Sequence, residues 1–255
     1  MTQEEMTLLV PQKLREIEQK YKVTVLYAAE SGSRAWGFAS PDSDFDVRFI
    51  YKRPREDYLR LDPPRDVIEL PVDETWDVVG WDLDKTLRLL HKSNPGLYEW
   101  LGSPICYLDT GFSTRIAPLM QSGFSERKML WHYLGMARVN KLRNLRGETV
   151  RPKKYLYVLR PLLACRWILD RHCAPPVPFS ALAAAELPDA LREAVAGLLE
   201  QKIHGPEALE IPHMKSLDAW IEQTEGEFPA LLEQIGEEEK SWQPLNDFFL
   251  SELQR

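Results

Sequence analysis

The spacing of hydrophobic residues changes character along the first 110 residues. Residues 4–20 carry apolar side chains at the three- and four-residue intervals of a helix, including Val10, Leu14 and Ile17. Four later stretches have the apolar and β-branched composition of strands: VTVLYAA (23–29), DFDVRFIY (44–51), DVIEL (66–70) and WDVVGW (76–81). This region therefore combines helices with several short strands.

Turn residues separate these expected elements. SPDS (40–43) precedes the second strand and PVDET (71–75) joins the third to the fourth, and both are rich in residues that favour turns. A helix should begin near Asp84 and end at the Ser-Asn-Pro of residues 93–95. The leucines that it would bury are Leu87, Leu89 and Leu90. We expect a mixed α/β domain over residues 1–110.

Strand spacing fades after about Ser113, and helical spacing replaces it. The segments with helical periodicity are 125–147, 152–172, 190–203 and 216–228. A proline-rich loop, CAPPVPF (173–179), divides the second of these from the third. The sequence therefore predicts a helical C-terminal domain over residues 111–255.

The composition is typical of a soluble globular protein. Of 255 residues, 44% are hydrophobic and 28% are charged. No apolar run approaches the roughly 18 residues that span a bilayer, and the polar start MTQEEMTLL lacks the pattern of a signal peptide. Three cysteines are too few and too unevenly placed for a disulfide framework. We expect a cytoplasmic protein that does not associate with membranes.

Charge is distributed unevenly along the chain. The formal net charge of −7 argues against generic nucleic-acid binding. Residues 126–166, however, hold eleven Lys and Arg against two Glu, whereas residues 186–255 hold sixteen Asp and Glu against five Lys and Arg. The basic segment is suited to following a nucleic-acid backbone in spite of the net charge.

Acidic residues crowd together in ESGSRAWGFASPDSDFDVRFIY (30–51). Side chains alternate faces along a strand, which puts Asp44, Asp46 and Arg48 on one face and the apolar residues between them on the other. Neighbouring carboxylates repel unless something positive lies between them, and hard oxygen ligands suit Mg²⁺. Two such ions often share one carboxylate site in enzymes of phosphoryl or nucleotidyl transfer, so the crowded acids would suit two Mg²⁺, with Mn²⁺ as an alternative.

A two-metal site would need a third carboxylate. The strand and helix start WDVVGWDL (76–83) offer Asp77 and Asp82, which differ in strand parity and so face opposite ways. Asp82 also stands where the next helix should begin, and aspartate is a common cap of the first turn. We favour Asp77 as the third ligand and keep Asp82 as the alternative.

Gly32 and Ser33 directly follow the first strand. A strand that ends in glycine lets the backbone approach a phosphate closely, and the following helix start and the Ser33 hydroxyl add hydrogen-bond donors. Two other acidic sites fit less well. Aspartyl-phosphate phosphatases carry Asp-x-Asp after an apolar strand, whereas here it precedes one, and DSDFDVRFIY lacks the central glycine of an EF-hand.

Together these features resemble the DNA polymerase β-type nucleotidyltransferase superfamily, whose motif is Gly-Ser, a spacer, Asp-x-Asp and a third acid on a later strand. More narrowly, with GWDLDKTLRLLHKSNPGLYEWL (80–101) and KKYLYVLRPLLACRWIL (153–169), the chain resembles a bacterial and phage family of predicted nucleotidyltransferases named for a proposed RNA repair pathway, the YcgL type. The similarity runs from about residue 20 to residue 175 and weakens in the acidic C-terminal part.

The resemblance implies an α+β fold, with a small mixed β-sheet flanked by helices and a mostly helical C-terminal domain closing one side of the cleft. It implies that Gly32 and Ser33 bind the triphosphate. The residues that it implies as catalytic acids and metal ligands are Asp44, Asp46 and Asp77.

Other family-like residues are candidates for binding the nucleotide. Lys153 and Arg160 lie seven residues apart on one helix face, where they would neutralise phosphate charge, and Tyr157 between them would pack on a base or sugar. A solvated helix face is the alternative for all three. Arg48 either balances the carboxylates or contacts the substrate, and Arg34 either contacts phosphate or faces solvent.

The function that the resemblance implies is Mg²⁺-dependent transfer of a nucleoside monophosphate from an NTP, with release of pyrophosphate. ATP is the expected NTP, and the acceptor is a hydroxyl or phosphate, on an RNA end or on a protein. The alternative is a catalytically silent nucleotide- or RNA-binding regulator, or an antitoxin-like interaction protein, which the basic segment favours.

Overall fold

The computed structural model describes residues 2–71, 76–206, 208–236 and 239–255. The chain forms two compact units, each discontinuous in sequence. The sheet unit comprises Met1–Ala35, Asp44–Phe124 and Glu239–Arg255, and the helical unit comprises Trp36–Ser43 and Ser125–Glu238. This division differs from the predicted domains 1–110 and 111–255, because the main boundary follows Phe124 and each unit takes in a segment from the other's predicted range.

A five-stranded mixed sheet forms the centre of the sheet unit, in the order β3-β4-β2-β1-β5. Its strands are β1 (Thr24–Glu30), β2 (Phe45–Lys52), β3 (Val67–Glu69), β4 (Trp76–Asp82) and β5 (Cys106–Asp109). β2 and β4 are parallel, and the other neighbouring pairs are antiparallel. The predicted α+β fold with a small mixed sheet is confirmed. The edge strand β5 was not predicted, because four residues are too few to show a periodic pattern.

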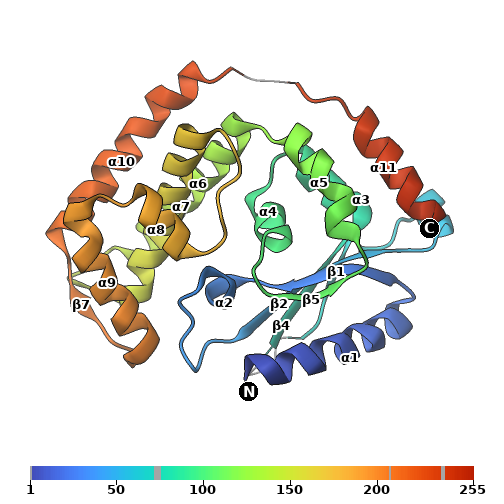
Figure 1. Cartoon of the computed structure of the whole chain (residues 1–255), viewed down its shortest axis with the longest axis horizontal. Helices are drawn as coiled ribbons and strands as arrows, with labels where there is room; N and C mark the ends of the chain where they lie inside the picture. The colour runs from blue at the N-terminus through green and yellow to red at the C-terminus, as the bar shows by residue number, and fades with distance from the viewer. Residues whose placement is uncertain (1, 72–75, 207, 237–238) are drawn as a thin grey trace. The chain divides into compact units, whose positions relative to one another are not determined.

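Helices cover both faces of this sheet (Figure 1). α1 (Gln3–Tyr21) lies along one face, and α3 (Leu83–His91), α4 (Pro95–Leu101) and α5 (Phe112–Gly123) lie on the other. The short α2 (Gly32–Trp36) follows β1, a 3-10 turn η1 (Arg55–Leu59) follows β2, and α11 (Gln243–Gln254) packs against α3. Both faces of the sheet are therefore covered by helices.

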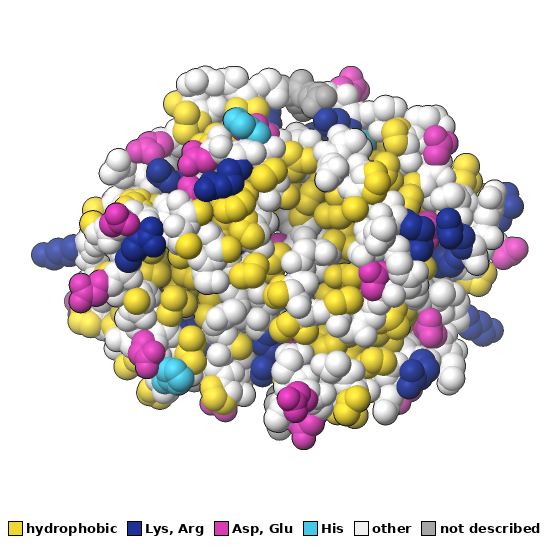
Figure 2. Space-filling model, in the orientation of Figure 1, with side chains coloured by type: hydrophobic (Ala, Val, Ile, Leu, Met, Phe, Trp, Pro, Cys, Tyr) yellow, Lys and Arg dark blue, Asp and Glu magenta, His cyan; other side chains and the backbone are white. Residues whose placement is uncertain are grey.

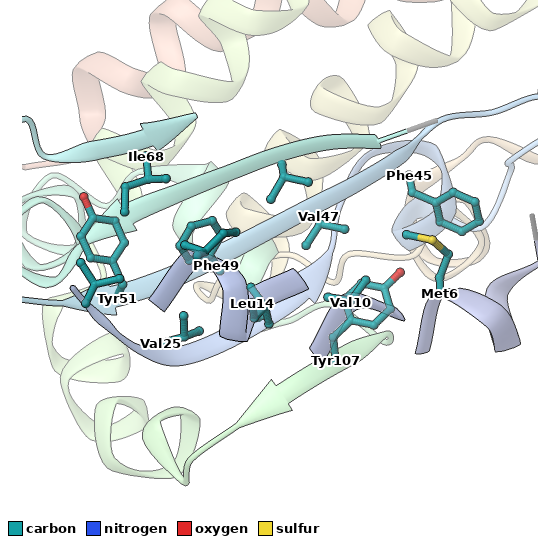
Figure 3. Packing of buried hydrophobic residues seen from close by; sticks show 14 residues of the cluster. Met6, Val10, Leu14, Val25, Phe45, Val47, Phe49, Tyr51, Ile68 and Tyr107 are labelled. Atoms are coloured by element: carbon teal, nitrogen blue, oxygen red, sulfur yellow. The ribbon is translucent and has the colours of Figure 1, made fainter. Parts of the chain in front are cut away.

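The core between α1 and the sheet explains the alternation along β2. The side chains that meet there include Met6, Val10 and Leu14 from α1 and Phe45, Val47 and Phe49 from β2 (Figure 3). Burying each such side chain contributes about 1.5–3 kcal/mol. α1 begins at a capping box, in which the Thr2 hydroxyl accepts from the Glu5 N–H and the Glu5 carboxylate accepts from the Thr2 N–H. One face of β2 is thus committed to the core, which leaves Asp46 and Arg48 on the other.

The helical unit consists of α6 (Glu126–Asn144), α7 (Pro152–Arg171), α8 (Phe179–Glu186), α9 (Asp189–His204) and α10 (Lys215–Gln234). A small ribbon pairs β6 (Thr149–Val150) with β7 (Ile211–Pro212). α7 packs against each of the other four helices. Its fully buried leucines are Leu156, Leu159, Leu162 and Leu163. The prediction of a mostly helical region beyond the sheet is confirmed, and its four periodic segments form α6, α7, α9 and α10.

α11 belongs to the sheet unit because it carries a buried carboxylate that the sheet unit neutralises. Glu252 is 1% exposed, and it accepts from Nε and Nη2 of Arg115 at 2.6 and 2.9 Å. Lys52 Nζ donates to the Glu252 backbone oxygen at 2.6 Å. Because these partners lie more than a hundred residues away in sequence, the periodicity of the last helix could not reveal where it packs.

Three local expectations have separate outcomes. Leu87 and Leu90 of α3 are buried as predicted, whereas Leu89 is only partly buried. The predicted turn at 71–75 includes residues 72–75, which lie outside the described residues. Within the described ranges, none of the helices combines the length and the apolar character needed to cross a membrane.

Candidate active site

Two carboxylates face each other at the start of two parallel strands. Asp46 of β2 is the direct neighbour of Asp77 of β4, so both side chains lie on the same face of the sheet. They are partly exposed, at 28% and 33%, whereas Phe45 and Val47 on either side of Asp46 are buried. The predicted parity of β2 is therefore confirmed, and the structure brings Asp46 and Asp77 together.

Arg48 lies between these two carboxylates. Its Nη2 donates to Asp46 Oδ1 at 2.9 Å and to Asp77 Oδ2 at 2.7 Å. Its Nη1 donates to the backbone oxygens of Asp77 at 2.9 Å and Val47 at 3.3 Å. One guanidinium thus balances two acids, which is one of the two roles predicted for Arg48.

The Gly-Ser turn lies against the Asp46 carboxylate. Gly32 has a φ of +59°, and a Cβ placed on it would lie 2.0 Å from Asp46 Oδ2. The Ser31 N–H donates to the Asp46 backbone oxygen at 2.8 Å, which continues the pairing of β1 with β2 as far as the turn. Only glycine accommodates both this conformation and this contact without strain. Ser33 follows within α2.

Asp44 and Arg34 lie at the edge of this arrangement. Asp44 is exposed and immediately precedes β2. Arg34 Nε donates to the Asp44 backbone oxygen at 3.2 Å, and the Arg34 guanidinium lies over the Phe45 ring, 3.6 Å from its centre. Arg34 is therefore held against the start of β2, beside the acids, rather than extended into solvent as in its alternative role.

Glu30, which was not among the predicted site residues, is a buried acid that hydrogen-bonds to the backbone of Asp46. Its side chain is completely buried. Oε1 accepts from the Asp46 N–H at 2.7 Å, Oε2 accepts from the Tyr107 hydroxyl, and Gln3 Nε2 donates to that hydroxyl at 3.0 Å. A lone acid at the end of the apolar run VTVLYAA was the available signal. Glu30 fixes the backbone of the residue that carries the first strand carboxylate.

Burial perturbs both of these carboxyl groups. Desolvation raises the pKa of Glu30 to about 7, against the opposing hydrogen bonds from Tyr107 and the Asp46 N–H. Desolvation also raises the pKa of Asp46; the Asp77 charge adds to that rise, and Arg48 opposes it. Perturbed carboxyl groups gathered in one place are typical of functional sites.

Asp82 has a structural role at the far end of β4. It is 3% exposed, its carboxylate caps α3 by accepting from the Asp84 N–H at 3.0 Å, and Arg53 Nε lies 3.5 Å from its Oδ2. Burial raises the pKa of Asp82 to about 6, although the Asp84 N–H, Tyr58 and Arg53 oppose the rise. The helix-cap interpretation of Asp82 is confirmed.

The donor chemistry at Asp46 and Asp77 suits Mg²⁺, which prefers carboxylate oxygens. In the part of the chain that the structure describes, no three His, Cys, Asp or Glu side chains converge closely enough to hold a metal ion. The third charged group beside Asp46 and Asp77 is Arg48, not another acid. Closing this site around a metal would require Arg48 to move away and Asp44 to approach.

The other candidate nucleotide-binding residues lie on α7, in the helical unit. Arg160 is 3% exposed; its guanidinium lies 4.6 Å from the centre of the Trp36 ring, and its Nη2 donates to the Val177 backbone oxygen at 3.2 Å. Tyr157 contacts Trp36 edge-on, and both Tyr157 and Lys153 are partly buried. The alternative of a solvated helix face is therefore wrong for Arg160.

The spacer between Gly-Ser and Asp-x-Asp, Trp36–Ser43, packs within the helical unit. Phe38 contacts Phe179 of α8, with ring centres 5.8 Å apart. Lys202 of α9 is buried and donates from Nζ to the hydroxyls of Ser40 at 2.9 Å and Ser43 at 3.4 Å. The chain thus leaves the sheet unit after the Gly-Ser turn, is anchored in the helical unit, and returns at Asp44.

The uneven charge of the sequence is partly compensated by the fold. Glu225 of α10 accepts from Arg138 at 3.2 Å and from Lys141 at 3.0 Å, both on α6. Arg127 of α6 donates to the Ile235 backbone oxygen at 2.7 Å. Acidic and basic side chains are interspersed on the face shown in Figure 2. Part of the basic segment is therefore engaged by the acidic segment.

A glycine turn after β1, an Asp-x-Asp at the start of β2 and an acid directly opposite on β4 are the features of a polymerase β-type nucleotidyltransferase fold. In keeping with this, the family model described as RNA repair pathway DNA polymerase beta family matches residues 6–251, and the chain belongs to that family. The resemblance predicted for residues 20–175 is confirmed and extends through the helical unit.

Known proteins similar to this chain include one relative in sequence and one solved structure. It is 46% identical over 198 residues to the uncharacterized protein YcgL of Bacillus subtilis (strain 168), a match that covers 76% of each sequence. A crystal structure of a nucleotidyltransferase-like protein from Exiguobacterium sibiricum 255-15 matches with 15% sequence identity and a TM-score of 0.32, covering 88% of this chain and 74% of that one. The first similarity confirms the predicted YcgL-type resemblance.

Proposed function

We propose that the protein is a Mg²⁺-dependent nucleotidyltransferase that moves a nucleoside monophosphate from an NTP, with ATP expected, to a hydroxyl or phosphate acceptor. The observation that carries the proposal is the direct opposition of Asp46 and Asp77 on parallel strands, beside the backbone of Gly32. Membership of the polymerase beta family supports a transferase in general. The acceptor class, an RNA end or a protein, is part of the proposal.

The metal ligands would be Asp44, Asp46 and Asp77, and Mn²⁺ could replace Mg²⁺. Bound there, the cations would supply charge neutralisation for the triphosphate and a lowered pKa for the attacking group. Asp46 and Asp77 are neighbours because β2 and β4 are parallel and in register at their starts; Asp44 would join them on metal binding. Glu30 would keep Asp46 in place through its hydrogen bond to the Asp46 N–H.

The remaining groups would orient the nucleotide. The Gly32 backbone allows close approach of the triphosphate, and the Ser33 hydroxyl would donate a hydrogen bond to it. Arg34, beside the start of β2, and Arg48, once released, would contact phosphate oxygens. In the helical unit, the proposed nucleotide-binding residues are Lys153, Tyr157 and Arg160 of α7.

The chemical step would be a displacement at the α-phosphorus. The acceptor oxygen forms a bond to that phosphorus, its proton passes to Asp77 acting as general base, and the bond to the bridging oxygen of the β-phosphate breaks. The electron pair of the broken bond leaves with pyrophosphate. Positioning and charge neutralisation, rather than a covalent enzyme intermediate, would provide the rate enhancement.

The test is transfer from α-labelled NTPs to total RNA and total protein, because the label reports both the base and the acceptor class. The unaltered protein should transfer label with Mg²⁺ and release pyrophosphate, and Asp44→Asn/Asp46→Asn should lose roughly 100-fold or more of that rate. The matched control is Asp62→Asn, an acid 82% exposed and paired with Arg60, which should retain it. Full activity in the double variant would sink the mechanism.

A nucleotide- or RNA-binding regulator without turnover is the second candidate. It is supported by a groove between α6 and α10 with a volume of about 480 Å³. Trp131, 64% exposed, lines this groove together with Arg127 and Lys128, a combination suited to base stacking and phosphate contacts. Pyrophosphate release in the assay above separates this candidate from the enzyme.

A further inference from the structure

We propose that Arg48 is a built-in counter-ion that holds the two strand acids together in the metal-free protein, and that a divalent cation must displace it to bind. This proposal rests on the proposed function, since it takes Asp46 and Asp77 as metal ligands. It goes beyond that function by assigning Arg48 a competing role that sets how tightly the site binds metal.

The geometry makes Arg48 and a shared metal ion mutually exclusive. A single nitrogen, Nη2, lies within 2.9 Å of a carboxylate oxygen from each acid. A cation coordinated to the same pair of oxygens, at about 2.0–2.1 Å for Mg²⁺, cannot share this space with a positively charged nitrogen. Metal binding to Asp46 Oδ1 and Asp77 Oδ2 therefore requires Nη2 to leave.

The Arg48 guanidinium reduces the electrostatic repulsion between the Asp46 and Asp77 carboxylates. Neighbouring strands lie about 4.8 Å apart, so two carboxylates in direct register repel at short range. Desolvation of Asp46, which is only 28% exposed, strengthens that repulsion. With Arg48 in place the three charges sum to −1 instead of −2, which stabilises the protein before any metal arrives. The same attraction must be overcome by the metal.

Backbone contacts keep Arg48 close after displacement. Nη1 donates to the Asp77 and Val47 backbone oxygens at 2.9 and 3.3 Å, and a metal between the carboxylates does not need these oxygens. The Arg48 side chain is 15% exposed, so little free space surrounds it. With Nη1 held by these oxygens as a pivot, the guanidinium would turn so that Nη2 swings away from the acids, which would leave Nη2 available for a phosphate oxygen.

The test is equilibrium Mn²⁺ binding, followed by electron paramagnetic resonance without any nucleotide. Arg48→Met keeps the side-chain length and removes the charge, and it should bind Mn²⁺ at least about tenfold more tightly than the unaltered protein. Its melting temperature should be lower without metal and should rise more on adding Mn²⁺. Arg60→Met removes an exposed arginine paired with Asp62 at 2.8 Å and should change neither quantity.

Contrary outcomes are distinct. If Arg48→Met and the unaltered protein bind Mn²⁺ equally tightly, the arginine does not compete with the metal. If Arg48→Met binds Mn²⁺ more weakly, the arginine assists metal binding, and if neither protein binds Mn²⁺, there is no metal site. Each of these three results overturns the proposal. None of these results depends on turnover, so the label-transfer assay judges the enzyme separately. If Arg48→Met does not fold, Mg²⁺ titration of the unaltered protein decides: the guanidinium N–H signals of Arg48 in NMR spectra should lose their exchange protection, and unchanged protection would overturn the proposal.

Discussion

The two ends of the β2–β4 pair carry the same residue types but use them differently. At the start of the strands, Asp46 and Asp77 share Arg48 and remain partly exposed. At the other end, Asp82 faces Arg53 and is almost completely buried, with a side-chain exposure of 4%. Only Asp82 also caps a helix.

The difference shows what separates a structural ion pair from a candidate site. The oxygens of Asp82 are engaged by the start of α3 and by Arg53, so the fold depends on them. By contrast, the side chains of Asp46 and Asp77 share one arginine, Arg48, as their counter-ion, and both remain partly exposed. The carboxylates of Asp46 and Asp77 are therefore better suited than that of Asp82 to bind a ligand.

The largest expected effect contrasts the two acids of β4. Asp77→Asn should lower NTP turnover by roughly 100- to 1000-fold with little change in stability, because a partly exposed pair contributes about 1 kcal/mol or less. Asp82→Ala should do the reverse: removal of the cap alone costs about 1 kcal/mol, and unpairing Arg53 adds to that. Turnover per folded molecule and urea unfolding measure the two effects, and similar turnover losses in both variants would erase the contrast.

The next largest effect is expected in the pH dependence of the unfolding free energy, to which Asp82 and Glu30 both contribute. Burial raises the pKa of Asp82 from 3.8 to about 6, so the folded protein favours the protonated carboxyl group. The stability that this group contributes to the fold is therefore fully present below pH 3.8 and is lost as the pH rises through about 6. The expected loss of unfolding free energy is on the order of 3 kcal/mol. Asp82→Asn should flatten this part of the curve, and Glu30→Gln should flatten a part nearer pH 7, where the Glu30 carboxyl titrates.

Urea unfolding at several pH values checks this prediction. Asp62→Asn is the control, because that acid lies on the surface and its stability curve should follow the unaltered protein. If the unfolding free energy of Asp82→Asn fell with pH as steeply as that of the unaltered protein, ionisation of the buried Asp82 would not be the cause of the loss.

The smallest expected effect concerns the turn beside Asp46. Gly32→Ala introduces a Cβ that would lie 2.0 Å from Asp46 Oδ2 at a φ of +59°, so the carboxylate must rotate away. Gly37→Ala carries similar backbone strain, with a φ of +85° and no atom within 4 Å of the new Cβ. Both should lose about 1 kcal/mol of stability, but only Gly32→Ala should also lower turnover, by roughly tenfold. Equal turnover in the two variants would show that the contact with Asp46 is unimportant.

Local rules explain what the sequence could predict. The alternation of β2 and the preference for Asp77 over Asp82 follow from strand parity, and the cap on α3 follows from residue type at a helix start. The strands β1 to β4 and the long helices have clear periodic patterns for the same reason.

Non-local contacts explain what the sequence could not predict. Glu30 meets Tyr107 across 77 positions of sequence, so this buried support has no local signature. Strand parity places Arg48 beside Asp46, but its second contact, with Asp77, spans 29 positions and has no local signature either. The placement of Trp36–Ser43 in the helical unit is non-local in the same way, since Lys202 anchors Ser40 across 162 positions.

The interleaving of the two units has a consequence for synthesis of the chain. A ribosome completes the sheet strands first, then the whole of Ser125–Glu238, and only afterwards α11, whose Glu252 neutralises Arg115. Until α11 is made, Arg115 and Lys52 lack their contacts with Glu252, so the sheet unit stays incomplete while more than a hundred residues of the helical unit are synthesised. Neither unit corresponds to one continuous stretch of messenger, and a truncation anywhere in the helical unit therefore also leaves the sheet unit unfinished.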